Sequence, residues 1–110
     1  MTQFRQKTST IAVAANGAEI ELFDGKTLLY RKDGDSMSLR IDFSFVHGGL
    51  SKPRVYLPEI PRWSSGWRLS AWEAALLKTD ICEGLLVFNL EAILLTDIVT
   101  TQPLIANLKG

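Results

Sequence analysis

The chain has 110 residues, the length of one domain, so we expect a single domain over residues 1–110. A hydrophobic fraction of 46% and a charged fraction of 22% are ordinary for a folded protein and exclude an intrinsically disordered class. The formal net charge is zero, so no overall field draws the molecule to nucleic acid or to an anionic membrane.

The first half predicts an antiparallel β-meander. Apolar and polar residues alternate over SMSLRIDFSFV (36–46), which places one face of a strand on a core and the other in water. Asn16-Gly17, Asp24-Gly25 and Asp33-Gly34 are dipeptides that readily adopt the positive φ angles of tight hairpin turns. The expected strands cover about residues 8–14, 18–23, 27–32 and 36–46.

The middle of the chain is less regular. RVYL (54–57) predicts a short strand after the irregular segment VHGGLSKP. Pro58 and Pro61 lack an amide hydrogen, so a central strand is not expected there. We therefore predict a loop over residues 58–68, with a turn at Ser64-Ser65-Gly66.

Ser70 and Glu73 form an S-x-x-E capping box ahead of AALLK, which predicts a helix near 70–79, although WRLSAW also fits a strand. The apolar segment that follows fits helical spacing from Ile81 to Val99 and β alternation from Leu86 to Leu94. Gly84 and the β-rich context slightly favour a strand, but residues 84–98 remain open between strand and helix. The predicted fold class is α+β, mainly β: an N-terminal four-stranded meander, one short helix and an apolar C-terminal segment closing a single core.

Catalytic and metal-binding chemistry has little support. With one histidine, His47, and one cysteine, Cys82, a zinc site built from several such ligands within one chain is excluded. His47 precedes Gly48-Gly49, but no G-x-S-x-G nucleophile motif accompanies it, so these glycines are interpreted as a turn. Cys82 lies in an apolar run and is interpreted as a small buried hydrophobe. We predict no enzyme, and no catalytic residue, metal or cofactor.

The expected location is the reducing cytoplasm. A single cysteine excludes an internal disulfide, and the start MTQFRQKTST has no signal-peptide character. The apolar run 84–95 is too short to span a bilayer and contains Asn89 and Glu91, so no membrane association is expected.

The stretch PRWSSGWRLSAW (61–72) holds all three tryptophans, and residues 52–68 carry an excess of three positive charges. Tryptophan, tyrosine and arginine are enriched at binding hot spots because they combine large contact area with a directed polar group. The candidate partner-binding residues are Arg54, Tyr56, Arg62, Trp63, Trp67 and Arg68. The alternative is structural: Trp72 belongs to the core, and Trp63 and Trp67 pack as a lid over the sheet.

These residues predict a non-catalytic protein-binding module. Its size and stand-alone character fit a small inhibitor or an immunity-type protein. This expectation rests on the type of chain and not on any sequence motif. The alternative is a single-stranded nucleic-acid-binding module in which the same aromatic rings stack on bases and the arginines meet phosphates. Nucleic acid is less favoured because residues 69–110 carry an excess of three negative charges. A sugar stacked on tryptophan is a weaker option, and a twofold homodimer through residues 81–99 is the simplest self-association.

Overall fold

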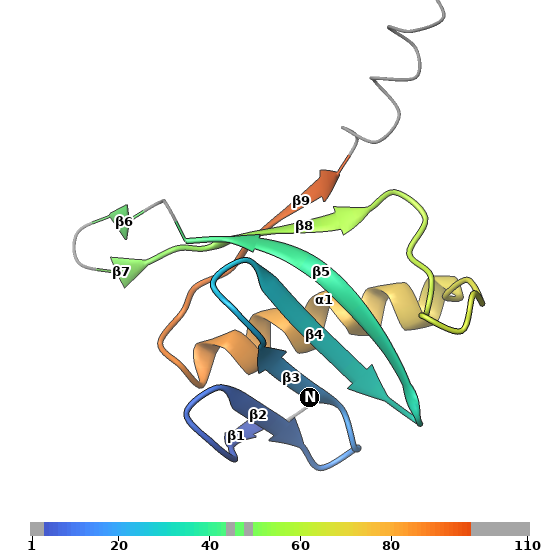
Figure 1. The fold of residues 1–110 in the computed structure, drawn as a ribbon, viewed down its shortest axis with the longest axis horizontal. Coiled ribbons are helices and arrows are strands. Elements are labelled where there is room, and N and C mark those ends of the chain that lie inside the picture. Colours follow the sequence, from blue (N-terminus) through green and yellow to red (C-terminus); the bar gives the residue numbers. More distant parts are fainter. Residues whose placement is uncertain (1–3, 44–45, 48–49, 98–110) are drawn as a thin grey trace, which may run out of the picture.

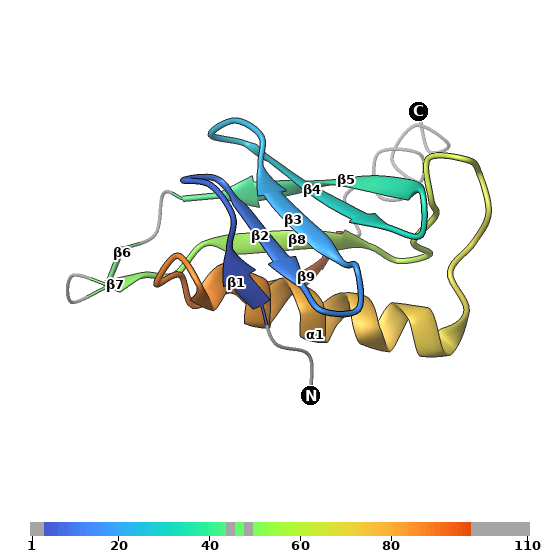
Figure 2. The same cartoon turned by 90° about the horizontal axis from the view of Figure 1, so that it is seen from below.

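The computed structural model describes residues 4–43, 46–47 and 50–97, and the remaining residues are outside this description. Within the described residues, seven strands form one mixed sheet and one helix, α1 (Ala71–Leu86), lies along one of its faces (Figures 1 and 2). The strands of this sheet are β1 (Phe4–Gln6), β2 (Ile11–Ala14), β3 (Glu19–Leu22), β4 (Thr27–Lys32), β5 (Asp35–Asp42), β8 (Arg54–Pro58) and β9 (Ile93–Asp97). A separate two-stranded ribbon pairs β6 (Val46–His47) with β7 (Leu50–Ser51). The predicted mainly-β α+β fold is confirmed.

Strands β1 to β5 follow one another as an antiparallel meander, in which the predicted four-stranded part is confirmed as β2 to β5. The last of these strands is shorter than the expected 36–46, because β5 ends at Asp42, and residues 44–45 lie outside the described residues. The β4–β5 turn has the positive φ angles expected of its dipeptide, 53° at Asp33 and 80° at Gly34. The turn at Asp24-Gly25 differs, because Gly25 does not have a positive φ. There the Asp24 carboxylate accepts a hydrogen bond from the Lys26 amide at 2.8 Å and closes the turn instead. Strand β1 was not predicted.

The sheet continues from β5 to β8 and then to β9, which confirms the short strand predicted at RVYL. Strands β8 and β9 are parallel, and Tyr56 stands beside Leu95 in their register. A parallel pair needs a crossover connection, and α1 supplies it. Because β8 runs into the loop before the helix, that loop lies at the same end of the sheet as the β4–β5 turn (Figure 1).

Helix α1 begins where the capping box predicts and is longer than expected. The Ser70 hydroxyl accepts a hydrogen bond from the Glu73 amide at 3.1 Å, and the Glu73 carboxylate accepts one from the Ser70 amide at 2.8 Å. The helix ends at Leu86 because Asn89 adopts a left-handed conformation, with φ 60°, which reverses the chain. Residues 81–86 are therefore helical and only 93–97 form a strand, so the preference for a strand from residue 84 was wrong.

The prediction that Gly84 favours a strand is wrong, because this glycine lies within α1 and serves helix packing. It is buried on the face of α1 that contacts the sheet, and a Cβ at this position would overlap the fully buried side chain of Ile20. The absence of a side chain thus lets the helix approach β3 closely.

The core lies between α1 and the sheet. Alternate residues of each strand point toward the helix, as in β8, where Val55 and Leu57 are buried and their neighbours face the other way. The buried cluster consists of Ala14, Ala18, Ile20, Leu28, Tyr30, Met37, Leu39, Ile41, Val55, Leu57, Leu77, Ile81 and Leu85. One charged residue, Asp80, is fully buried within it among the described residues.

Candidate functional site

The predicted loop contains a small hairpin, which we call the tryptophan hairpin (residues 62–68). Arg62 and Arg68 form an antiparallel bridge. The Trp63 amide donates to the Trp67 carbonyl at 2.8 Å, and the Gly66 amide donates to the Trp63 carbonyl at 2.8 Å. Gly66 has a φ of 102°, a conformation that glycine adopts without steric cost. The predicted turn at Ser64-Ser65-Gly66 is confirmed.

The tryptophan hairpin is fastened to the start of β5. The Asp35 carboxylate accepts hydrogen bonds from the Ser64 hydroxyl at 3.2 Å and from both the amide and the hydroxyl of Ser65. The Ser64 amide also donates to the Ser36 carbonyl at 2.8 Å. The hydrogen bonds to the Asp35 carboxylate, of which that from the Ser65 hydroxyl is the largest contribution, lower the pKa of Asp35 below its ordinary value. The hairpin is thereby held in one place rather than left as a free loop.

The three tryptophans have different environments. Trp63 is half-buried against the core, and its ring stacks on Tyr30 with centroids 5.9 Å apart and an interplanar angle of 20°. Trp67 is 78% exposed and Trp72 is 72% exposed. The lid interpretation thus holds for Trp63 and is wrong for Trp67.

The expectation that Trp72 belongs to the core is also wrong. It lies in the first turn of α1, five residues before the buried Leu77, which places it about 140° away around the helix axis. The register set by the Ser70 cap turns this side chain to solvent, and the sequence pattern alone did not define which face of α1 would meet the sheet.

The six candidate binding residues divide between two faces. Arg62, Trp63, Trp67 and Arg68 are together in the tryptophan hairpin. The other two, Arg54 and Tyr56, project from β8 on the sheet face opposite α1, because their neighbours Val55 and Leu57 point into the core.

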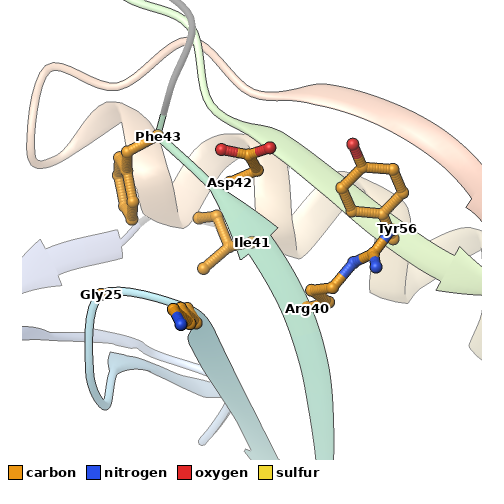
Figure 3. Close-up of a pocket in the computed structure, with 7 residues that line it drawn as sticks. Gly25, Arg40, Ile41, Asp42, Phe43 and Tyr56 are labelled. Carbon is orange, nitrogen blue, oxygen red and sulfur yellow. The ribbon is translucent and has the colours of Figure 1, made fainter.

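On that opposite face, Tyr56 forms a cation–π contact that sequence reasoning missed. The guanidinium carbon of Arg40 lies 4.0 Å from the centroid of the Tyr56 ring, and the two residues are directly paired between β5 and β8 (Figure 3). A hollow of about 590 Å³ lies beside them. It is lined by Gly25, Lys26, Arg40, Ile41, Asp42, Phe43 and Tyr56. The polar side of the alternating strand 36–46 was the available signal for Arg40.

A second, smaller hollow of about 200 Å³ opens beside the tryptophan hairpin, between the β4–β5 turn and the first turn of α1, and we call it the aromatic pocket. It is lined by Tyr30, Lys32, Asp33, Trp63, Trp72, Glu73 and Leu76. The sequence assigns Asp33 to a turn and Glu73 to a helix cap, and no sequence pattern predicts that these two residues line the same hollow.

The positions considered for chemistry offer no assembled centre within the described residues. His47 forms part of β6 in its backbone, and Gly48-Gly49 lie outside the described residues. Cys82 is partly buried and not a member of the buried core, so the interpretation as a buried hydrophobe holds only in part. Burial, and secondarily the charge of Glu83, raises the pKa of its thiol. No cluster of three or more histidine, cysteine, aspartate or glutamate side chains that could hold a metal occurs in the described part of the chain.

Comparison of the chain with protein-family models, curated proteins and solved structures gives no match. Within residues 4–43, 46–47 and 50–97, no helix has the length and apolar character needed to cross a membrane.

Proposed function

We propose that this chain is a non-catalytic protein-binding module that engages a partner protein through the tryptophan hairpin and the adjoining first turn of α1. The observation that carries the proposal is the exposure of Trp67, at 78%, on a hairpin that is anchored to the sheet by Asp35. An exposed tryptophan on a fixed support can bury a large area in a partner without a further ordering cost for the loop.

The charged groups around the hairpin support a protein partner over nucleic acid. One guanidinium nitrogen of Arg62 donates to the Gly66 carbonyl at 3.2 Å, so this arginine already serves the hairpin itself. Asp33, Asp35 and Glu73 lie close by, and carboxylates repel a phosphate backbone. A small inhibitor or an immunity-type protein that blocks its partner is the form of this function that we favour.

Site-specific photocrosslinking tests the proposal. Benzoylphenylalanine placed at position 67 or 72 of the full chain should crosslink a defined protein in an extract of the source cells. The same residue at position 23 is the matched control, because Phe23 is an aromatic side chain that is 62% exposed in the turn between β3 and β4. A product shared equally by all three positions, or no product from 67 and 72, would contradict the proposal.

A salt series separates the two classes of partner. A nucleic-acid complex of a protein contacting several phosphates weakens by orders of magnitude between about 50 and 200 mM salt. We expect the crosslinked product to survive nuclease treatment and to change little across that range. Loss of the product with nuclease would favour the single-stranded nucleic-acid alternative.

A further inference from the structure

The aromatic pocket combines rings and carboxylates in a way that the tryptophan hairpin alone does not. Its wall includes Tyr30 and Trp63, which are fixed by stacking on each other, and Trp72 from the first turn of α1. Two acidic residues, Asp33 and Glu73, line the same hollow, and the Glu73 carboxylate also accepts the capping hydrogen bond from the Ser70 amide. Aromatic faces carry negative electrostatic potential, so both kinds of group favour a cation.

The hydroxyl of Tyr30 fixes the position of this aromatic wall. It donates a hydrogen bond to Oδ2 of the fully buried Asp80 at 2.7 Å, and Oδ1 of Asp80 has no hydrogen-bond donor among the described residues. The Tyr30 ring is itself 2% exposed, so it contributes to the pocket by holding the stacked ring of Trp63 in place. Burial, and secondarily the bond to Asp80, raises the pKa of Tyr30, so its hydroxyl remains protonated and donates this bond across the physiological range.

The charge balance of the pocket is negative. Its lining contains two acidic residues, Asp33 and Glu73, and one basic residue, Lys32. The volume of about 200 Å³ is below the roughly 300–1,000 Å³ of sites that enclose a whole small molecule. A single side chain, with its backbone outside on the surface, matches this size better than a free metabolite.

We propose that the aromatic pocket receives one lysine or arginine side chain of the partner protein, an inference that rests on the proposed protein-binding function and specifies its chemistry. The cationic head group lies against the rings of Trp63 and Trp72, and Asp33 and Glu73 neutralise its charge. Trp67 contacts a neighbouring part of the same partner, so the hairpin supplies contact area and the pocket supplies selectivity for a basic residue.

The test measures the pocket directly with model peptides. The indole N–H resonances of the three tryptophans are followed by NMR in the full chain while capped tripeptides Gly-Lys-Gly, Gly-Arg-Gly and Gly-norleucine-Gly are added to about 20 mM; weak, millimolar binding is expected for one side chain. The basic peptides should shift the resonances of Trp63 and Trp72 and leave Trp67 nearly unchanged. Norleucine has the apolar stem of lysine without the charge and should cause no saturable shift. Equal shifts from norleucine, or no shift from either basic peptide, would overturn the proposal.

Charge variants with conserved shape provide the second measurement. Asp33→Asn suits the left-handed backbone at this position, and Glu73→Gln retains the capping box. We expect the double variant to weaken binding of the lysine peptide at least fivefold and Lys32→Gln to strengthen it about twofold, whereas Glu59→Gln, outside the pocket, leaves it unchanged. Unaltered affinity in the double variant would overturn the proposal.

The two proposals can fail separately. A partner crosslinked through position 67, together with no charge-dependent peptide binding, would leave the protein-binding function standing and remove the cation pocket. Charge-dependent peptide binding without any crosslinked protein would leave the pocket as a cation site and remove the proposed function.

Discussion

The hydroxyl of Tyr30 and the carboxylate of Asp80 are joined by a 2.7 Å hydrogen bond between β4 and α1, across 50 residues of sequence and inside the core. Both side chains are almost completely buried. Since a buried carboxyl group without a partner is costly, the bond fixes which residue of the helix meets the sheet at this point.

Removal of the Tyr30 hydroxyl should therefore destabilise the protein. We expect Tyr30→Phe to lower the free energy of unfolding by about 1–3 kcal/mol, because Asp80 would lose its single described donor. The double variant Tyr30→Phe with Asp80→Leu should be more stable than Tyr30→Phe alone, since both polar groups are then replaced. Urea unfolding of Tyr30→Phe, Asp80→Leu and the double variant measures this coupling. If the two single losses in the free energy of unfolding simply add up in the double variant, the coupling is contradicted.

Gly84 gives a second test of the helix–sheet contact. Alanine is favoured over glycine in a helix by about 1 kcal/mol, but a methyl group here would overlap Cδ1 of Ile20, which is fully buried. We expect Gly84→Ala to destabilise the protein by about 1–3 kcal/mol.

The matched second-site variant is Ile20→Val, which removes the overlapping Cδ1 atom. Alone it should cost about 0.5–1.5 kcal/mol, and combined with Gly84→Ala it should recover most of the loss. If Gly84→Ala stabilises the wild-type background, the close approach of α1 to β3 is not as described.

The tryptophans should separate by their effect on stability. Trp67→Ala is expected to change the free energy of unfolding by less than about 0.5 kcal/mol, because the side chain is exposed. Trp63→Ala should cost about 1–3 kcal/mol through loss of its packing on the core and on Tyr30. Thermal unfolding of the two variants checks this, and unfolding of the chain by Trp67→Ala would show that this residue is core.

Fluorescence provides an independent reading of the same assignment. Wild-type emission should be dominated by exposed indoles and readily quenched by acrylamide, and Trp72→Phe should remove part of the quenchable signal. A protected, blue-shifted emission from the variant that retains Trp67 would contradict its exposure.

Local signals predicted most of the elements of the fold. The alternation that begins at residue 36, the Asp33-Gly34 turn and the Ser70–Glu73 capping box each determine structure through near neighbours. The alternation continues to residue 46, but β5 ends at Asp42. The secondary structure of residues 84–98 could not be predicted in this way, because helical and β periodicity both fit the apolar run. The sequence around Asn89 also gave no specific signal for the left-handed conformation that reverses the chain there.

The candidate site depended on contacts between distant segments. Trp63 is less exposed than Trp67 because its ring stacks on Tyr30, a residue 33 positions earlier in the chain. Likewise, the pocket needs Asp33 and Glu73 to line one hollow, and no local pattern relates a turn residue to a capping residue 40 positions away. Composition identified the segment, and tertiary contacts decided which of its side chains are available.

Acid should loosen the attachment of the tryptophan hairpin to β5. The folded-state pKa of Asp35 is lowered from its ordinary value of 3.8, chiefly by the hydrogen bond from Ser65. A carboxyl group with a lowered folded-state pKa contributes stability that is present above 3.8 and is lost as the pH falls through the lower folded-state value. The hydrogen bonds to the Asp35 carboxylate are therefore intact at neutral pH and weaken only below the ordinary range of aspartate, whereas the bond from the Ser64 amide to the Ser36 carbonyl does not titrate.

The measurement uses a Trp67→Phe, Trp72→Phe background, in which Trp63 is the remaining fluorophore. Its emission should shift to longer wavelength as the pH falls below about 3.8, while far-UV circular dichroism reports whether the sheet is retained. Asp35→Asn should remove the pH step. Asp24→Asn is the control, because Asp24 also has a lowered pKa but closes the turn between β3 and β4, so its replacement should leave the step in place. A step that persists in Asp35→Asn would assign the transition to another group and remove the anchoring role of this carboxylate.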